Sequence, residues 1–247
     1  MASKMIELES GGSFPAYVVE PEGTVKGGLI VIHEVWGLAP HIKDVAGRFA
    51  KEGYLVVAPD LLSDSGITAE LVGDLQEELF DPARRNAAQP KIRQLMAPLQ
   101  APGFGEKTAS RVQACFDYLQ DQPQVDGKVA ITGFCFGGTY SFSLAVHEPR
   151  LKAAVPFYGH SDFSSDDLKK IKCPVLAFYG ANDERLIDGL EKLKQDMKSA
   201  NVNFAAKIYP DCGHAFFNDT NRFAYNEAAA ADAWLEANKF LAANISK

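Results

Sequence analysis

The sequence has few of the features that mark secreted or membrane proteins. Its 247 residues include four cysteines, which form no C-x-x-C pair and no metal-ligand spacing. A chain of this length needs no disulfide bonds to support its core, so we expect reduced thiols. No apolar run approaches the length that spans a bilayer, and the first residues lack the apolar stretch of a secretory signal. These absences argue against a membrane protein and predict a cytoplasmic location.

Positive charge is also scarce. Lys and Arg number 25 against 32 Asp and Glu, which gives a formal net charge of −7. Electrostatics therefore gives no reason to expect nucleic acid or an anionic membrane as a partner, and a small molecule is the better candidate. His33-Glu34 is not followed by a second histidine one helical turn later, and no calcium-loop pattern is present, so we expect no metal and no cofactor. No apolar stripe stands apart from the core helices, which makes a monomer the default.

Apolar runs and helical segments alternate along the chain. Continuous apolar runs, typical of strands covered on both faces, occupy residues 29–32, 54–58, 129–132, 153–158, 175–179 and 204–209. Helical spacing occupies residues 42–52, 108–120, 139–147, 186–200 and 225–243. Before them, residues 5–8 and 16–19 flank Gly11-Gly12 and predict a β-hairpin. We therefore expect a single α/β domain over residues 1–247, with a mostly parallel sheet, helices on both faces and ligands at the carboxyl ends of the strands.

Residues 61–107 interrupt this alternation. The segment contains a helical pattern at residues 69–80 and a helix-start signal at Asp81-Pro82, and several prolines and glycines follow them. An excursion of this length inside a compact domain is often a functional lid. We therefore expect a lid-like excursion at about residues 61–107.

Cys135 points most directly to a function. It lies in Gly133-Phe134-Cys135-Phe136-Gly137-Gly138, between a strand-like run and a helix-like segment. A nucleophile on such a turn occupies a strained elbow, where glycines let backbones approach closely and the helix N-terminus favours an anionic sulfur. A free cysteine is more often a small buried residue, so the elbow needs partners before it indicates catalysis.

Candidate partners follow Cys135 in the chain. A cysteine nucleophile needs a base, and the base needs an acid to orient it. Asp183 comes directly after the strand-like run that ends at Tyr179, and His214 comes after the run that ends near Tyr209. The order nucleophile, acid, histidine is the one that accompanies such elbows. The other histidines lack this placement: His33, His41, His147 and His160.

Two backbone N–H groups are expected to stabilise an oxyanion. One belongs to Phe136, the residue after the nucleophile, and the other comes from the loop after the first buried strand. Val35 is the candidate for the second donor, although it could be an ordinary residue at a strand exit. Four aromatic residues could line the pocket or belong to the core: Trp36, Phe136, Tyr158 and Phe216.

With these residues in this order, the chain resembles the dienelactone hydrolase family (carboxymethylenebutenolidases), cysteine-nucleophile members of the α/β-hydrolase fold. The similarity covers nearly the whole chain. It rests on Phe14-Pro15-Ala16-Tyr17, His33-Glu34-Val35-Trp36-Gly37, Ala58-Pro59-Asp60-Leu61, Gly133-Phe134-Cys135-Phe136-Gly137-Gly138, Phe157-Tyr158-Gly159, Gly180-Ala181-Asn182-Asp183 and Gly213-His214-Ala215-Phe216. The resemblance implies an α/β-hydrolase fold and hydrolysis of esters or lactones.

The resemblance also gives Glu34 a role. In the family, the glutamate after the early strand contacts the resting thiol and takes part in its activation. A carboxylate beside Cys135 disfavours a thiolate through like charge, whereas movement toward a cationic partner would let the thiolate form near His214. The alternative is a structural or solvated loop carboxylate.

Arginines that bind a substrate carboxylate are a further implication of the resemblance. Arg84 or Arg85, in the 61–107 excursion, could supply one of them. Which of the two points inward is open, and a solvated helix face is the alternative for each. A second family arginine, a few residues past the histidine, is missing, since this chain continues to Asn218. Arg222 could compensate if that segment turns helically.

Together these residues predict a hydrolase that carries its acyl group as a thioester on Cys135. A thiolate is itself a good leaving group, so enol lactones and activated esters are better substrates than alkyl esters or amides. The missing arginine leaves a broader carboxylesterase or thioesterase as an alternative. A non-catalytic protein of the same fold, in which Cys135 senses oxidants or holds a ligand, is the alternative from another class.

Overall fold

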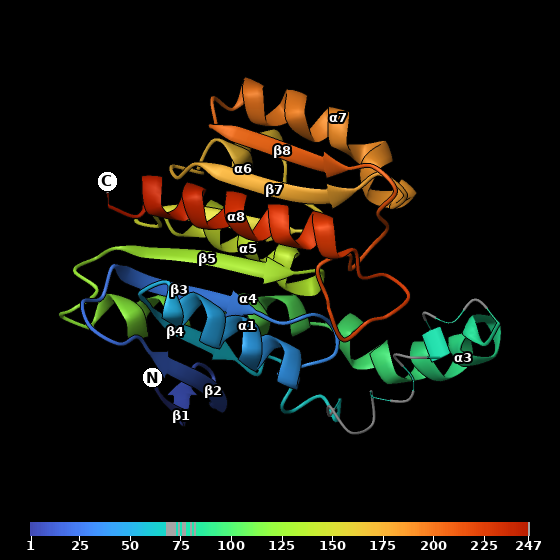
Figure 1. The fold of residues 1–247 in the computed structure, drawn as a ribbon, viewed down its shortest axis with the longest axis horizontal. Coiled ribbons are helices and arrows are strands. Elements are labelled where there is room, and N and C mark those ends of the chain that lie inside the picture. The colour runs from blue at the N-terminus through green and yellow to red at the C-terminus, as the bar shows by residue number, and fades with distance from the viewer. Residues whose placement is uncertain (68–72, 74, 76–77, 80, 82, 247) are drawn as a thin grey trace.

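A twisted sheet forms the centre of the protein (Figure 1). The computed structural model describes residues 1–67, 73, 75, 78–79, 81 and 83–246, and within them eight strands lie in the order β1-β2-β4-β3-β5-β6-β7-β8. Their bounds are β1 Ala2–Glu9, β2 Ser13–Glu20, β3 Gly27–Ile32, β4 Tyr54–Pro59, β5 Val129–Phe134, β6 Ala153–Phe157, β7 Val175–Gly180 and β8 Phe204–Tyr209. The pairs β1–β2 and β2–β4 are antiparallel, and the other neighbours are parallel.

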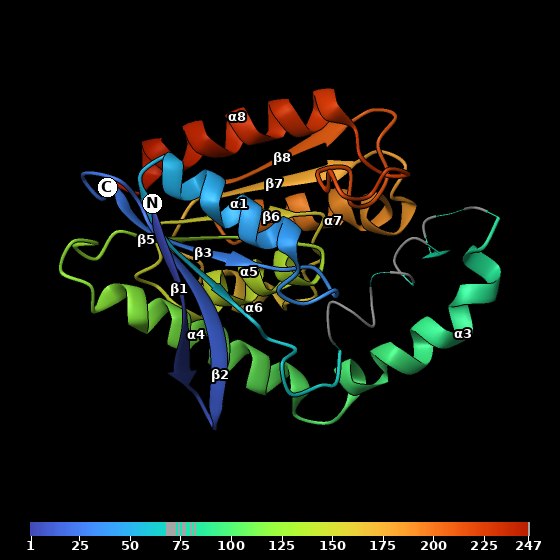
Figure 2. The same cartoon turned by 60° about the horizontal axis from the view of Figure 1, so that its bottom comes forward.

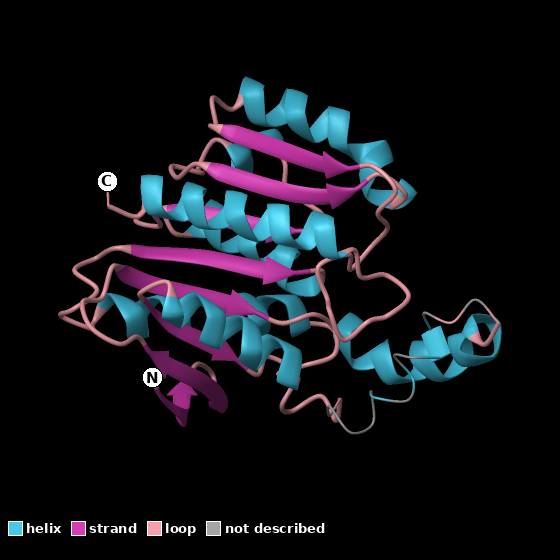
Figure 3. Ribbon diagram, viewed as in Figure 1, coloured by secondary structure: helices cyan, strands magenta, loops and turns pink. Residues whose placement is uncertain are grey.

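The middle of the sheet is buried on both faces. Every residue of β3, β4, β5 and β6 is buried, as their continuous apolar sequences predict. In β3, Ile30 pairs with Val57 of β4 on one side and with Ile131 of β5 on the other. Figure 3 shows the arrowheads of the parallel strands at one edge of the sheet, so the loops that carry chemistry lie together there.

Helices cover both faces of the sheet (Figure 2). Their bounds are α1 Pro40–Lys51, α3 Arg85–Met96, η1 Ala97–Gln100 (a 3₁₀ turn), α4 Phe104–Gln120, α5 Phe136–His147, α6 Ser165–Leu168, α7 Glu184–Ser199 and α8 Glu227–Asn244. One core cluster joins the sheet to α1 and α8, and another joins its opposite face to α4, α5, α6 and α7. The predicted sheet, hairpin and helices are thus confirmed, with most helices beginning a few residues earlier than their apolar spacing indicates.

Local sequence explains where several helices begin. Pro40 occupies the first turn of α1, where its missing N–H costs nothing. The side chain of Asn226 caps α8 by accepting a hydrogen bond from the Ala229 N–H at 3.0 Å. Alanines then form much of the buried face of α8, including Ala233 and Ala237, which lets this helix lie close to the sheet.

The segment between β4 and α4 leaves the body of the molecule. Figures 1 and 2 both show α3 extending away from the sheet. The helix predicted at residues 69–80 falls largely outside the described residues. Among the helices that are described, none is both long enough and apolar enough to cross a membrane.

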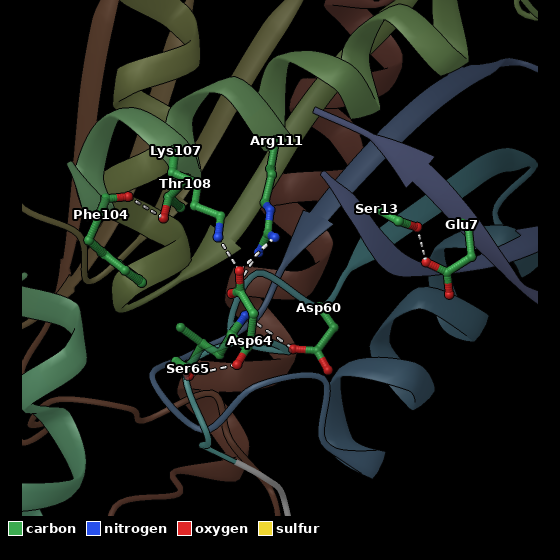
Figure 4. A network of polar contacts seen from close by, with 10 residues as sticks. Glu7, Ser13, Asp60, Asp64, Ser65, Phe104, Lys107, Thr108 and Arg111 are labelled. Carbon is green, nitrogen blue, oxygen red and sulfur yellow. Dashed lines mark hydrogen bonds and ion pairs between the residues drawn. The ribbon is translucent and has the colours of Figure 1, made fainter. Parts of the chain in front are cut away.

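A polar network joins the two ends of this segment (Figure 4). The Arg111 guanidinium of α4 donates two hydrogen bonds to the Asp64 carboxylate, at 3.0 and 2.9 Å, and Lys107 also pairs with Asp64. Burial would raise the pKa of Asp64, but its bonds to these two cations hold that pKa below its usual range. The network fixes the start of α4 and therefore the position of Phe104, its first residue.

Candidate active site

Cys135 lies on a strained turn between β5 and α5. Its backbone has φ 55° and ψ −110°, a conformation that L-residues rarely adopt. The Cys135 N–H donates to the Phe157 carbonyl at 3.0 Å. Close backbone packing holds the turn, because a Cβ added at Gly133 would lie 2.3 Å from the Gly137 carbonyl oxygen. This geometry holds the half-buried thiol at the carboxyl edge of the sheet.

Asp183 and His214 lie together although 31 residues separate them. Asp183 precedes α7, just after β7, and its Oδ2 accepts a hydrogen bond from His214 Nδ1 at 2.5 Å. The loops that carry the two residues touch, since the Asn182 N–H donates to the Cys212 carbonyl at 2.8 Å. Gly180 permits this approach, because a Cβ there would lie 2.4 Å from that same oxygen.

The surroundings of His214 favour its protonated form. Burial lowers its pKa, but the charge of the Cys135 thiolate and hydrogen bonds to Asp183 and Cys135 raise it, and the net result is a pKa well above the usual value. The Tyr158 ring lies against the imidazole, with a centroid separation of 5.0 Å. An imidazolium beside a thiolate is the charge arrangement that activates a cysteine nucleophile.

A cavity of about 520 Å³ opens above Cys135, within the usual size range for small-molecule sites. Its lining is Val35, Leu99, Phe104, Gly105, Cys135, Phe136, Thr139, Tyr140, Tyr158, His160, Asp183, Arg185, Leu186 and His214. Two of the four aromatic residues considered from the sequence line it, Phe136 and Tyr158. Trp36 packs instead with Leu62 and Ile67, and Phe216 is buried in the core.

The two expected oxyanion donors both border this cavity. Phe136 is the first residue of α5, and Val35 lies in the loop after β3. Neither N–H makes a hydrogen bond to another described residue. The first N–H groups of a helix have no partner within the helix, so that of Phe136 remains available to a ligand.

Glu34 is buried behind the cavity and does not belong to its lining. Its Oε2 accepts a hydrogen bond from Asn218 Nδ2 at 2.6 Å, and its Oε1 accepts one from the Tyr158 hydroxyl at 3.4 Å. Burial raises the pKa of Glu34, while the charge of His41 and the bond from Asn218 oppose the rise. Asn218, which stands where the sequence lacks a family arginine, therefore holds Glu34 by a neutral hydrogen bond.

The arginines considered from the sequence lie elsewhere. Arg84 pairs with Asp81 at 2.8 Å, and Arg85 donates to the Leu79 carbonyl at 3.1 Å. Both are exposed, and neither they nor Arg222 line the cavity.

The structure brings Arg185 to the cavity in their place. Arg185 has no ion-pair partner among the described residues. The sequence alone gave no sign that the Arg185 side chain would border the site.

Comparison with known proteins places the chain in a family. The dienelactone hydrolase family profile matches residues 14–245. The chain belongs to the dienelactone hydrolase family. A Saccharolobus solfataricus protein named "Putative carboxymethylenebutenolidase" is 32% identical over 98% of both chains. A Salmonella typhimurium protein of the same name is 32% identical over 91% of this chain and 80% of its own.

Solved structures agree on the fold. A structure from Klebsiella pneumoniae titled "Putative Dienelactone Hydrolase" superposes with a TM-score of 0.79 at 28% identity, over 98% of this chain and 99% of that one. A dienelactone hydrolase-like promiscuous phosphotriesterase from metagenomic libraries gives a TM-score of 0.77 at 23% identity, over 98% of both chains. This dienelactone hydrolase family member therefore has the α/β-hydrolase fold, as the sequence resemblance implies.

Proposed function

We propose that the protein is a carboxylic ester hydrolase that opens enol lactones or cleaves activated esters through a thioester on Cys135. The observation that carries the proposal is the position of Cys135. It stands on a strained elbow and borders a cavity that also contains His214, whose Nδ1 lies 2.5 Å from Asp183 Oδ2. Nucleophile, base and acid are the three parts that cysteine acyl transfer requires.

In the proposed reaction the Cys135 thiolate attacks the substrate carbonyl carbon. The carbonyl electron pair moves to oxygen, where the N–H groups of Phe136 and Val35 stabilise it. Collapse breaks the ester C–O bond, and the departing oxygen takes the proton of the His214 imidazolium. His214, oriented by Asp183, then removes a proton from water as the water attacks the thioester, and the thiolate leaves.

We propose that Arg185 receives an anionic group of the substrate. It is a cation on the cavity wall without an ion-pair partner among the described residues, and guanidinium groups bind carboxylates well. The protein as a whole carries a net charge of −7, so an anion would need a local positive group of this kind.

A broader carboxylesterase or thioesterase is the second candidate. Seven of the lining residues are apolar or aromatic, including Leu99 and Phe104. The arginines at 84 and 85 lie outside the lining. Both observations suit a neutral acyl chain. A substrate panel of anionic enol lactones and neutral p-nitrophenyl esters separates the two: a preference for the anionic lactones supports the first proposal, and a preference for neutral esters supports the second.

Replacement of the nucleophile tests both hydrolase proposals. We expect Cys135→Ala to lower turnover of every substrate by at least about a thousandfold. Mass spectrometry of the unmodified enzyme during turnover should show an acyl adduct on the peptide that contains Cys135. Cys212→Ala removes a buried thiol two residues from His214 and should retain turnover. Full activity in Cys135→Ala, or reversible oxidation of Cys135 without any acyl adduct, would contradict catalysis by this thiol.

A further inference from the structure

A second, much smaller cavity lies behind Glu34, apart from the cavity that holds the thiol. It measures about 20 Å³ and is lined by Glu34, Trp36, Gly37, Ala39, His41, Ile42, Asn218 and Thr220. Glu34 therefore lies between the two cavities. Tyr158, to which it is hydrogen-bonded, borders the large cavity, and His41 borders the small one.

His41 presents an unsatisfied nitrogen in this region. Its side chain is 3% exposed, and its Nδ1 donates to Asp219 Oδ1 at 2.9 Å. Its Nε2 is buried and has no hydrogen-bond partner among the described residues. The Phe134 and Phe217 rings pack beside the imidazole at 6.4 and 6.5 Å and can offer Nε2 no hydrogen-bond acceptor or donor of their own. The polar residues that line the small cavity are therefore the place to look for a partner. A buried polar atom left unpaired costs about 1–3 kcal/mol.

Among the groups that face Glu34, His41 is the one that most strongly lowers its pKa. Burial is the largest influence and raises the pKa of Glu34, and the charge of His41 is the largest influence that lowers it, ahead of Asn218, His214 and Tyr158. His214 already pairs with Asp183 and faces the thiol. His41 is therefore the histidine in a position to balance the charge of Glu34.

Behind His41, the charges continue to the surface. Asp219 has a side chain that is 40% exposed, and the Arg48 guanidinium lies 3.7 Å from its other carboxylate oxygen. Since Asp219 accepts the bond from Nδ1, Nε2 is the ring nitrogen left for a partner in the small cavity that His41 borders. The two sets of residues are arranged alike. In each, an aspartate holds the Nδ1 of a histidine, and that histidine interacts with the charge of a third residue, which is Glu34 for His41 and Cys135 for His214.

We propose that one water molecule bound in the small cavity bridges His41 Nε2 to the Glu34 carboxyl, and that His41, oriented by Asp219, sets the charge on Glu34. The cavity volume of about 20 Å³ suits a single water. A water there has polar partners in His41, Glu34 and Thr220, and it can accept from or donate to Nε2 in either protonation state. His41 acts through Glu34 and is a positioning residue.

A high-resolution crystal structure of the unmodified protein tests the water site. We expect one ordered water within hydrogen-bond distance of both His41 Nε2 and a Glu34 oxygen. An empty cavity, or a direct contact between the imidazole and the carboxyl, would overturn the bridge.

A titration tests the control of charge. The ¹³C-labelled Glu34 carboxyl is followed by NMR against pH, and its signal is assigned by its loss in Glu34→Gln. In His41→Gln the side chain keeps a hydrogen-bonding amide but cannot become charged, so we expect the pKa of Glu34 to rise by about one unit or more. His147→Gln, a substitution on an exposed part of α5, should leave the Glu34 titration unchanged. An unchanged Glu34 pKa in His41→Gln would contradict the proposal.

Asp219→Asn provides a second test that leaves the buried imidazole in place. The asparagine oxygen can still accept from His41 Nδ1, but the charge of the carboxylate that orients the imidazole is gone, so under the proposal the pKa of Glu34 should again rise. A fall or no change would refute the role of Asp219. The inference about His41 depends on the proposed function in one respect only, which is the effect of the Glu34 charge on Cys135. Because the titration needs no substrate, the inference and the hydrolase activity can fail independently.

Discussion

At the scale of single residues, the proposed preference for an anionic substrate is tested at Arg185, which borders the cavity. We expect Arg185→Gln to raise KM for anionic enol lactones by about tenfold or more, since hydrogen bonds to a charged group contribute about 1.5–3 kcal/mol. The substrate anion lies away from the reacting bond, so kcat should change little. Steady-state kinetics with an anionic lactone and a neutral ester measures both effects.

Arg85→Gln is the matched control for this prediction. It removes an exposed guanidinium of α3 that lies outside the cavity lining, and KM for both substrates should stay unchanged. If Arg85→Gln raised KM for the anion and Arg185→Gln did not, the arginine expected from the sequence would be the binding residue after all.

The sequence indicates some of the candidate site residues much better than others. Cys135, Asp183 and His214 can be found because each lies within a few residues of the end of a strand, so chain order predicts their meeting. Arg185 cannot be found in this way, since the direction of a long side chain depends on packing around α7. The bond from Asn218 to Glu34 depends in the same way on how a loop folds back over 184 residues of chain.

At the level of elements, the contact between α5 and the sheet depends on residues without side chains. A Cβ at Gly137 would lie 2.4 Å from the Ile32 carbonyl oxygen of β3. The obstacle is backbone, which cannot move aside as the end of a flexible side chain can. We expect Gly137→Ala to lower the free energy of unfolding by about 1–3 kcal/mol, measured by urea denaturation.

Gly189→Ala should have the opposite sign. Gly189 lies inside α7, and a Cβ added there would meet no atom within 4 Å. Alanine is the better helix former, so the free energy of unfolding should rise by about 0.5–1 kcal/mol. Equal effects of the two substitutions would show that the elbow is not closely packed.

The fold itself is well predicted by periodicity, and the exceptions have a physical cause. Buried parallel strands such as β3 and β5 give continuous apolar runs that few other structures give. The start of α5 is less visible in the sequence, because its first residues, Phe136 and Gly137, suit the tight turn and the close backbone packing there and do not follow helical spacing. α3 is indicated only by the helix-start signal at Asp81-Pro82, and its extent is not visible because it buries little apolar surface and contains Pro90.

For the whole molecule, Glu34 links the site to stability. Burial raises its pKa, so the folded state binds this proton more tightly than the unfolded state does. The resulting stability is present below the unfolded pKa of about 4.3 and is lost as pH rises through the folded pKa. We therefore expect Glu34→Gln to be more stable than the unmodified protein at pH 8, with a smaller difference at low pH, in urea titrations at each pH.

Glu148 offers a control of opposite sign. Its hydrogen bonds with Arg150 lower its pKa, so its contribution to stability is present above the unfolded pKa and is lost on acidification. Glu148→Gln should therefore be less stable than the unmodified protein at pH 8 and nearly equal to it at low pH. If both glutamine variants changed stability in the same direction at pH 8, the assigned signs would be wrong.

The strand order has a consequence for how the protein loses activity. Within the described residues β8 is an edge strand that pairs with β7 alone, and its residues are less buried than those of β5. Local opening at a sheet edge costs less than global unfolding. Such an opening would carry His214 away from Asp183 while β5 still held Cys135 in place. If the proposed roles of Cys135 and His214 hold, we expect ageing or mild heating to leave molecules that look native by circular dichroism but have lost turnover and expose the Cys135 thiol to oxidants.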